Sequence, residues 1–237
     1  MTNARIEAHW AAQLAAAPGT TLLPKAADDS NTNLGWDPKL RALVGHLGVG
    51  IRLEDLTLLA GNESLPLDKK TVKEALAWLA KKLEVAELRL PEHDMPPHSG
   101  TFTLPDPAEL IALAREYAIA HEALDVVHRK VHGASPVRCW PHHFDIATLI
   151  TVTRDRTIGA GMSPGDASYA DPYWYVTPWP YPPADTALPP LPEGHWHREG
   201  WTGAIYQGEE HPGDFFAAAI KACQSLHMRA ASADTAR

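Results

Sequence analysis

The distribution of proline is the feature that most constrains how this chain can fold. Eleven of its 21 prolines lie between Ser135 and Trp201, together with five of its eight tryptophans. Proline has no backbone N–H and a fixed φ, so it interrupts helices and is confined to strand edges or strand starts. We therefore expect this part to form short strands joined by turns, over Phe144 to Thr153, Pro172 to Trp179 and Trp201 to Tyr206.

The N-terminal part begins with a pattern typical of a helix. Within residues 2–17, Ile6, Trp10 and Leu14 recur every four positions, and Pro18-Gly19 predicts the end of that helix. The stretch from Leu34 to Ala60 is ambiguous, because it is rich in Leu and Val but also carries several glycines. Only its segment from Val49 to Leu53 reads as a possible strand.

Three further helices are predicted from their ends. Thr71 and Glu74 have the spacing of a capping box, which predicts a helix start. Asp106-Pro107 combines a capping residue with proline at the first helical position, and that helix should run to about His132. A closing helix is expected over residues 212–228.

The order of these elements predicts the fold class. Helices come first, then antiparallel strands, then one more helix, which favours an α+β fold with a sheet from the C-terminal half packed against several helices. The change in composition near Gly133 spans only a few residues, so it is too short for a linker. We therefore expect one domain, with a helical part over 1–133, a β-rich part over 134–210 and a helix over 212–228.

Composition limits the partners and the compartment. The formal net charge is −8 and no basic stripe is present, so we do not expect binding to nucleic acid. No run of about 18 apolar residues predicts a membrane span, and the first residues lack the apolar core of a signal peptide. The two cysteines, Cys139 and Cys223, are too few for a disulfide framework, so we expect a cytoplasmic protein.

The strongest candidate site lies in the segment WPHHFD. If residues 138–153 form one strand, Trp140 and His142 point to one face, and His143 and Asp145 to the other. Asp145 could then orient His143 as a general base, or both could bind one divalent metal ion. The alternative is a hydrogen bond between these two that only satisfies a half-buried strand.

Two other histidine groups have spacings that suit metal binding. On the helix predicted from Asp106 to about His132, one stripe carries His121, Asp125, His128 and His132. The alternative is a solvated helix edge, which we favour for that stripe because charged faces at this spacing are common on exposed helices. His195 and His197 form an H-x-H pair, which places both imidazoles on one face if the segment is a strand.

The segments after the candidate strand add polar and aromatic groups. Gly161 to Gly165 match the G-x-S-x-G pattern of esterases, but Pro164 lacks the N–H that such sites need, so we reject Ser163 as a nucleophile. Asp166 belongs to a turn and could face a pocket or cap its own turn. On the next strand, which its prolines place at a sheet edge, Tyr173, Tyr175 and Trp179 share one face and could line a ligand cleft.

Taken together, these motifs resemble an uncharacterised bacterial family, a domain of unknown function, in which a WPHHFD segment is followed by SPGD and DPYxYV. The resemblance covers about Ser135 to Trp201. It implies that the following residues are characteristic positions: His142, His143, Asp145, Pro164, Asp166, Asp171, Tyr173 and Tyr175. At Asp171 the family pattern leads us to expect glutamate. No activity is implied.

Three hypotheses about function follow. The first is an enzyme, a hydrolase or lyase acting on a small molecule, which uses His142, His143, Asp145 and Asp166, has Tyr173, Tyr175, Trp179 and Trp140 as ligand-binding residues, and is assisted by a divalent metal bound to His143 and Asp145. The second is a small-ligand-binding module without chemistry. The third is an interaction protein whose aromatic edge strand pairs with a partner or with a second copy in a homodimer.

Overall fold

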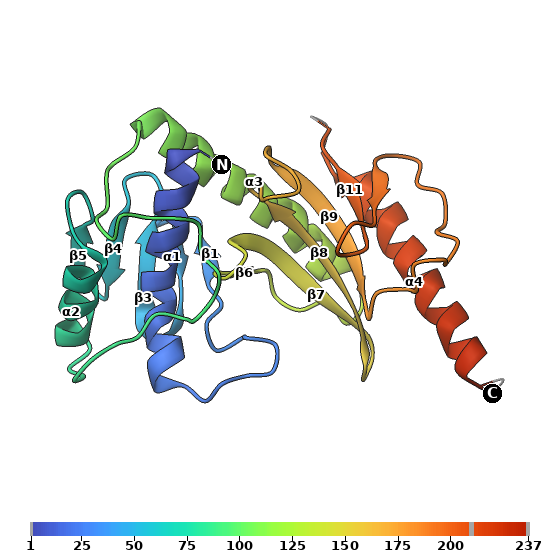
Figure 1. Cartoon of the computed structure of the whole chain (residues 1–237), viewed down its shortest axis with the longest axis horizontal. Helices are drawn as coiled ribbons and strands as arrows, with labels where there is room; N and C mark the ends of the chain where they lie inside the picture. The colour runs from blue at the N-terminus through green and yellow to red at the C-terminus, as the bar shows by residue number, and fades with distance from the viewer. Residues whose placement is uncertain (1, 209–210, 236–237) are drawn as a thin grey trace. The chain divides into compact units, whose positions relative to one another are not determined.

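The computed structural model describes residues 2–208 and 211–235, and it shows an α+β fold with two antiparallel sheets. The expected fold class is thus confirmed (Figure 1). The chain forms two compact units, Met1–Ile119 with Arg138–Asp145, and Ala120–Val137 with Ile146–Arg237. The expected single domain stays a prediction. Among the helices of the described residues, none is long and apolar enough to cross a membrane.

The sheet of the first unit lies in the region expected to be mainly helical. Its five strands are neighbours in sequence order and antiparallel: β1 (Gly35–Asp37), β2 (Ala42–Val44), β3 (Val49–Arg52), β4 (Thr57–Ala60) and β5 (Glu63–Pro66). Each has only three or four residues, which is too short for an alternating pattern to stand out. Tight turns join several of them, with positive φ at Arg41, Leu56 and Gly61.

Helix α1 (Asn3–Leu22) packs on β2, β3 and β4 of this sheet. Its contact face is made mainly of alanines, and Ala8, Ala11, Ala12 and Ala15 are fully buried. The prediction that Pro18-Gly19 ends the helix is wrong, because the helix continues to Leu22 with Pro18 inside it. Gly19 instead lets the backbone near Asn31 pack closely against the helix, because a Cβ at Gly19 would lie 1.8 Å from the backbone oxygen of Asn31.

The two predicted helix starts in the middle of the chain are confirmed. Helix α2 (Val72–Lys82) has the full capping box, in which the Glu74 N–H donates to Thr71 Oγ1 at 3.1 Å and the Thr71 N–H donates to Glu74 Oε2 at 2.7 Å. Helix α3 (Pro107–Lys130) runs from the first unit into the second. Asp106 caps it by accepting a hydrogen bond from the Ala108 N–H.

The sheet of the second unit has the order β10-β11-β9-β8-β7 within that unit. Its strands are β7 (Asp145–Thr153), β8 (Arg156–Ser163), β9 (Tyr173–Trp179), β10 (His195–His197) and β11 (Gly203–Tyr206). Helix α4 (Gly213–Thr235) packs on β8 and β9, as the closing helix expected from the sequence. Strand β8 was not expected, because Gly159 and Gly161 lower its apparent strand propensity.

The aromatic strand β9 is not at a sheet edge, which corrects the prediction from its prolines. It lies between β8 and β11, and its pairing with β11 covers Trp174 to Val176. Pro178 lies beyond that pairing, so its missing N–H does not interrupt the ladder with β11. This stretch is therefore not free to pair with a second copy, and a homodimer stays a prediction without this strand as its basis.

Gly161 makes room for the predicted ligand-binding residue Tyr175. A Cβ at Gly161 would lie 2.6 Å from the Tyr175 ring and 2.7 Å from Ala147 Cβ, whereas a Cβ at Gly159 would meet only Thr177 Cγ2 at 3.2 Å and the ring edge at 3.9 Å. We expect Gly161→Ala to lower the free energy of unfolding by about 1–3 kcal/mol.

Gly159→Ala on the same strand is the matched control, and we expect a change within about 0.5 kcal/mol. Urea denaturation of both variants measures this difference. Equal stability of the two variants would show that the Tyr175 ring does not need the space above Gly161.

Candidate functional site

The WPHHFD segment does not form part of one continuous strand. Strand β6 (Arg138–Trp140) ends before it, β7 begins at Asp145, and Pro141–Phe144 form a turn, here called the PHHF turn. The Trp140 carbonyl accepts hydrogen bonds from the N–H groups of His143 and Phe144, and Phe144 has a φ of 53°. The expected alternation of His142 and His143 across a strand is therefore wrong, because both lie on this turn.

Helix α1 holds the PHHF turn in place. The Pro141 carbonyl accepts a hydrogen bond from His9 Nε2 at 2.7 Å and another from Gln13 Nε2 at 2.6 Å. The His9 ring also stacks on Phe144, with ring centroids 5.1 Å apart. Tyr117 Oη donates to the Phe144 carbonyl at 2.6 Å. The conformation of the turn is thus fixed by buried groups that are distant in sequence.

The turn brings histidine side chains together. The rings of His142 and His143 are 4.3 Å apart between centroids, and the His93 ring is 4.9 Å from that of His142. His143 is exposed and His142 is half-buried, with a buried Nδ1 that has no hydrogen-bond partner. Burial and then the neighbouring imidazoles lower the pKa of His142 to about 4. His142 is therefore neutral near neutral pH.

Asp145 has different surroundings from the exposed His143. Its side chain is buried, with 9% of the residue exposed. Burial and then the charges of Cys139 and Asp145 raise the pKa of Tyr117, which places the carboxylate among these buried groups. Asp145 as the group that orients His143 stays a prediction.

The expectation of a metal ion at His143 and Asp145, or at the histidine stripe of the long helix, gains no support from the structure. Within residues 2–208 and 211–235, no three His, Cys, Asp or Glu side chains are grouped so that they could hold a metal ion. This holds for His143 with Asp145 and for the predicted helix stripe, whose last member, His132, lies beyond the end of α3 at Lys130. In that stripe Asp125 pairs with Arg129 and His128 Nδ1 donates to the Ala134 carbonyl, so these side chains have structural partners.

The other predicted site residues belong to the second unit, except Trp140, whose Nε1 donates to the Asp28 carbonyl in the first. Asp166 caps its own turn, because Oδ1 accepts from the N–H groups of Ser168 and Tyr169. Its Oδ2 accepts from Tyr173 Oη at 2.6 Å. Trp179 is 56% exposed and contacts Tyr181 edge-on. Asp166 therefore organises a turn and anchors Tyr173.

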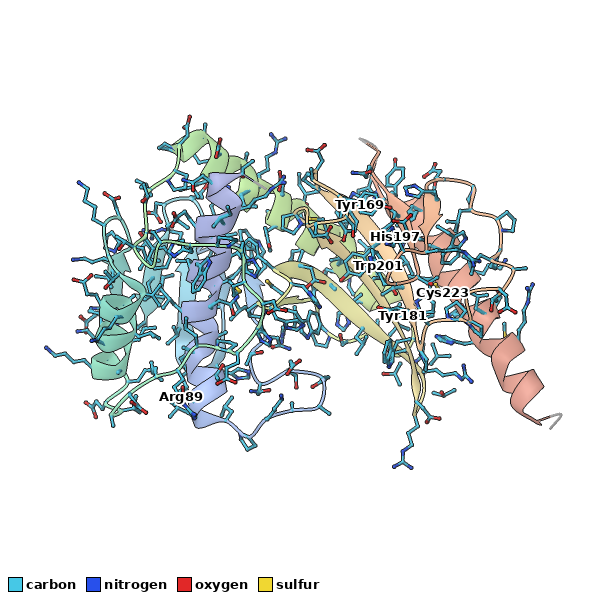
Figure 2. All side chains as sticks on the ribbon, in the orientation of Figure 1. Arg89, Tyr169, Tyr181, His197, Trp201 and Cys223 are labelled. Carbon is cyan, nitrogen blue, oxygen red and sulfur yellow. The ribbon has the colours of Figure 1, made fainter. Side chains whose placement is uncertain are left out.

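Tyr169, which no sequence motif marks, lies between the two histidines of the H-x-H pair. Its Oη is 3.0 Å from His195 Nε2 and 3.1 Å from His197 Nδ1. The pair itself was detectable from its spacing, and β10 confirms that the two imidazoles lie on one strand. Figure 2 shows Tyr169, His197 and Trp201 following one another on the second unit.

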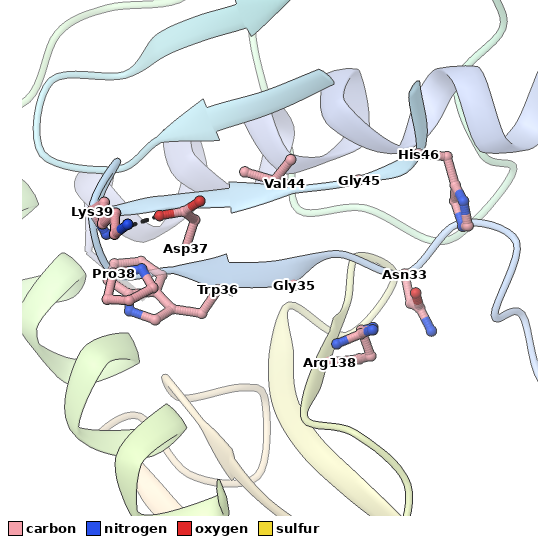
Figure 3. Close-up of a pocket in the computed structure, with 10 residues that line it drawn as sticks. All are labelled: Asn33, Gly35, Trp36, Asp37, Pro38, Lys39, Val44, Gly45, His46 and Arg138. Carbon is pink, nitrogen blue, oxygen red and sulfur yellow. Dashed lines mark hydrogen bonds between the residues drawn. The ribbon is translucent and has the colours of Figure 1, made fainter. Parts of the chain in front are cut away.

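The first unit contains a cavity that sequence reasoning missed (Figure 3). Its volume is about 530 Å³, and it is lined by Asn33, Gly35, Trp36, Asp37, Pro38, Lys39, Val44, Gly45, His46 and Arg138. Most of these residues come from β1, β2 and the turns beside them, and Arg138 starts β6. No motif marks such a cavity, because its walls combine residues that are far apart in the chain.

Comparisons with known proteins add no relative. A scan against family models found no match, and searches of curated proteins and of solved structures found none either. The resemblance to an uncharacterised bacterial family therefore stays a prediction.

The buried imidazole of His9 makes the stability of the fold dependent on pH. Burial is the main cause that lowers the pKa of His9 to about 4, whereas a histidine in the unfolded chain has a pKa of about 6.5. Between these values the unfolded chain binds more protons than the folded one. The free energy of unfolding is therefore highest above this window and decreases as the pH is lowered through it, by up to about 1.4 kcal/mol per pH unit for one group.

In His9→Gln the amide can still donate to the Pro141 carbonyl but binds no proton. We expect a smaller loss of stability between about pH 6 and about pH 4.5 than in the wild type, measured by urea denaturation. His132→Gln, at an exposed position, should keep the wild-type dependence. The same slope in both variants would contradict a lowered pKa at His9.

Proposed function

We propose that the first unit binds a small molecule that carries an anionic group, such as a carboxylate or a phosphate. The observation that carries this proposal is the cavity of Figure 3, which has Arg138 at one end and the apolar side chains Trp36 and Pro38 at the other. Its volume of about 530 Å³ is in the range of about 300–1,000 Å³ that is usual for small-molecule sites.

The polar end of the cavity suits an anion. Arg138, Asn33 and His46 lie near one another there (Figure 3). Arg138 lies over Gly35, where a Cβ would be 3.5 Å from Nη1, so the guanidinium rests against the backbone of β1. A guanidinium offers a planar fork of donors that matches a carboxylate or a phosphate. His46 is held by its Nε2, which lies 3.2 Å from the Ser30 carbonyl oxygen.

The acidic residue in the lining does not oppose an anion strongly. Asp37 Oδ1 accepts hydrogen bonds from the N–H groups of Lys39 and Leu40, at 2.8 and 3.0 Å. Its charge is thus partly compensated by the turn that it caps. At the other end, Trp36 and Pro38 form an apolar wall beside Asp37 and Lys39. The ligand that fits best has a flat apolar body and one anionic group.

Binding can be measured by titration calorimetry with benzoate, indole-3-acetate and inorganic phosphate as probes. We expect an aromatic carboxylate to bind more tightly than phosphate, because only the carboxylate also fills the apolar end. Arg138→Ala should raise the Kd by about tenfold or more, equivalent to about 1.4 kcal/mol.

Arg154→Ala is the matched control, since it removes an exposed arginine of the second unit. It should leave the Kd unchanged. Equal affinity in the Arg138→Ala and Arg154→Ala variants, or no binding of any probe at millimolar concentration, would exclude the cavity as an anion site.

A second candidate function is hydrolase or lyase chemistry at the PHHF turn. It is favoured by the neutral imidazole of His142, with its unpartnered Nδ1, beside the exposed His143. A neutral imidazole can accept a proton, as a general base must.

In a panel of chromogenic esters and amides, His143→Ala should abolish turnover and His132→Ala should preserve it. Turnover that survives in His143→Ala would rule out this role.

A further inference from the structure

Three atoms that commonly bind metals converge on the surface of the second unit. Tyr169 Oη lies 3.0 Å from His195 Nε2 and 3.1 Å from His197 Nδ1. Tyr169 comes from the turn before β9, whereas the histidines alternate along β10 and so share one of its faces. His195 is exposed, and Tyr169 and His197 are half-buried, so the point between them is open to solvent.

The second ring nitrogen of His197 determines how this residue can act. His197 Nε2 lies 2.8 Å from the Glu199 carbonyl oxygen, so Nε2 carries the proton and donates it in this hydrogen bond. In the neutral imidazole, Nδ1 then has a lone pair directed at the Tyr169 oxygen. The Trp201 ring packs on the imidazole, with centroids 4.6 Å apart. In a metal-bound histidine, the ring N–H that does not face the metal commonly donates to a backbone carbonyl, a carboxylate or water.

Tyr169 is positioned by the turn that carries it. The Asp166 N–H donates to the Tyr169 carbonyl at 2.7 Å, and Asp166 Oδ1 accepts from the Tyr169 N–H at 3.0 Å. Asp166 is in turn held by Tyr173 Oη, and the rings of Tyr169 and Tyr173 are 4.9 Å apart. The backbone of Tyr169 is thus held by hydrogen bonds to Asp166 and its ring by packing against Tyr173, so the phenol is not positioned by the histidines alone.

We propose that Tyr169, His195 and His197 form a binding site for a divalent transition-metal ion of borderline softness, such as Zn²⁺, Ni²⁺ or Cu²⁺. A tetrahedral ion with bonds of about 2.0–2.1 Å separates its ligand atoms by about 3.3 Å, so outward shifts of a few tenths of an ångström are enough to admit it. Imidazole nitrogen suits these ions, and a phenolate oxygen completes the set. Only two of these ligands are His, Cys, Asp or Glu side chains, since the third is a tyrosine. The site is therefore not one of the groups of three such side chains that were considered for the metal expectation above.

The proton balance of binding is defined by the hydrogen bonds. Before binding, the Tyr169 O–H donates to His197 Nδ1, and His195 Nε2–H donates to the Tyr169 oxygen. On binding, the phenol proton leaves to solvent, His195 moves its proton to Nδ1, and all three ligand atoms present lone pairs. One proton is released per ion.

The charges that face Tyr169 favour a cation. Asp166 and Glu199 are the acidic residues whose charges act on Tyr169. The same two carboxylates give the site a negative potential that attracts the ion. Arg198 lies in the chain between His197 and Glu199. Its Nη1 donates to the Ala184 carbonyl and its Nη2 donates to the Thr186 carbonyl.

Titration calorimetry of the full chain, purified without a histidine tag, tests the site with Zn²⁺. We expect one ion per chain with a Kd in the micromolar range or tighter, and an increase in Kd of about tenfold or more in His195→Ala and in His197→Ala. His132→Ala, which removes an exposed imidazole elsewhere in the second unit, should bind as the wild type does. Circular dichroism without metal confirms that each variant is folded.

The role of the phenol has its own readout. With Cu²⁺, the wild type should show a visible phenolate-to-copper charge-transfer band, and Tyr169→Phe should lose this band while it keeps the ring packing against Tyr173. Titrations in two buffers of different ionisation enthalpy should give about one released proton per ion in the wild type and fewer in Tyr169→Phe.

Two results would overturn the proposal. One is undiminished binding in the His195→Ala/His197→Ala double variant, which would assign the ion to other histidines. The other is an unchanged charge-transfer band and unchanged proton release in Tyr169→Phe, which would remove the phenol from the ligand set.

Discussion

The first unit depends on a helix that is buried over most of its length and carries polar side chains into the interior. His9 and Gln13 of α1 both donate to the Pro141 carbonyl, and Glu7 pairs with His98 at 3.1 Å. A buried polar group without a partner costs about 1–3 kcal/mol, so these side chains can be buried only where their partners are placed correctly. The helix therefore fixes the conformation of the PHHF turn as well as packing on the sheet.

This constraint changes what the histidine motif means. The WPHHFD segment was predicted to be a site because it combines imidazoles with a carboxylate. Several of its groups instead hold the turn: the Pro141 carbonyl, the Phe144 ring and the Phe144 carbonyl. What remains for chemistry is a neutral His142 beside an exposed His143. The cavity with Arg138, by contrast, has no sequence motif but has the volume and the mixed lining that a ligand needs.

In the second unit the carboxylate of Asp166 likewise holds several groups in place. Its carboxylate closes a turn, anchors Tyr173 and thereby sets the place of Tyr169 between two histidines. The wall of aromatic side chains is possible because β8 has small residues opposite them, and the close approach of the Tyr175 ring to Gly161 is one example. β9 can lie inside the sheet despite its prolines because its pairing with β11 ends at Val176, before Pro178.

The sequence by itself determined the α+β class, the start of α2 and of α3, and the strands over 173–179 and 203–206, because capping, proline placement and local periodicity are properties of neighbouring residues. Of the five short strands of the first unit it indicated only β3, as the possible strand over Val49 to Leu53, and it did not determine the other four, the turn at His142 and His143, or the place of Tyr169. Those depend on partners distant in the chain, such as His9 with Pro141 and Gly19 with Asn31, and only tertiary packing decides which of them meet.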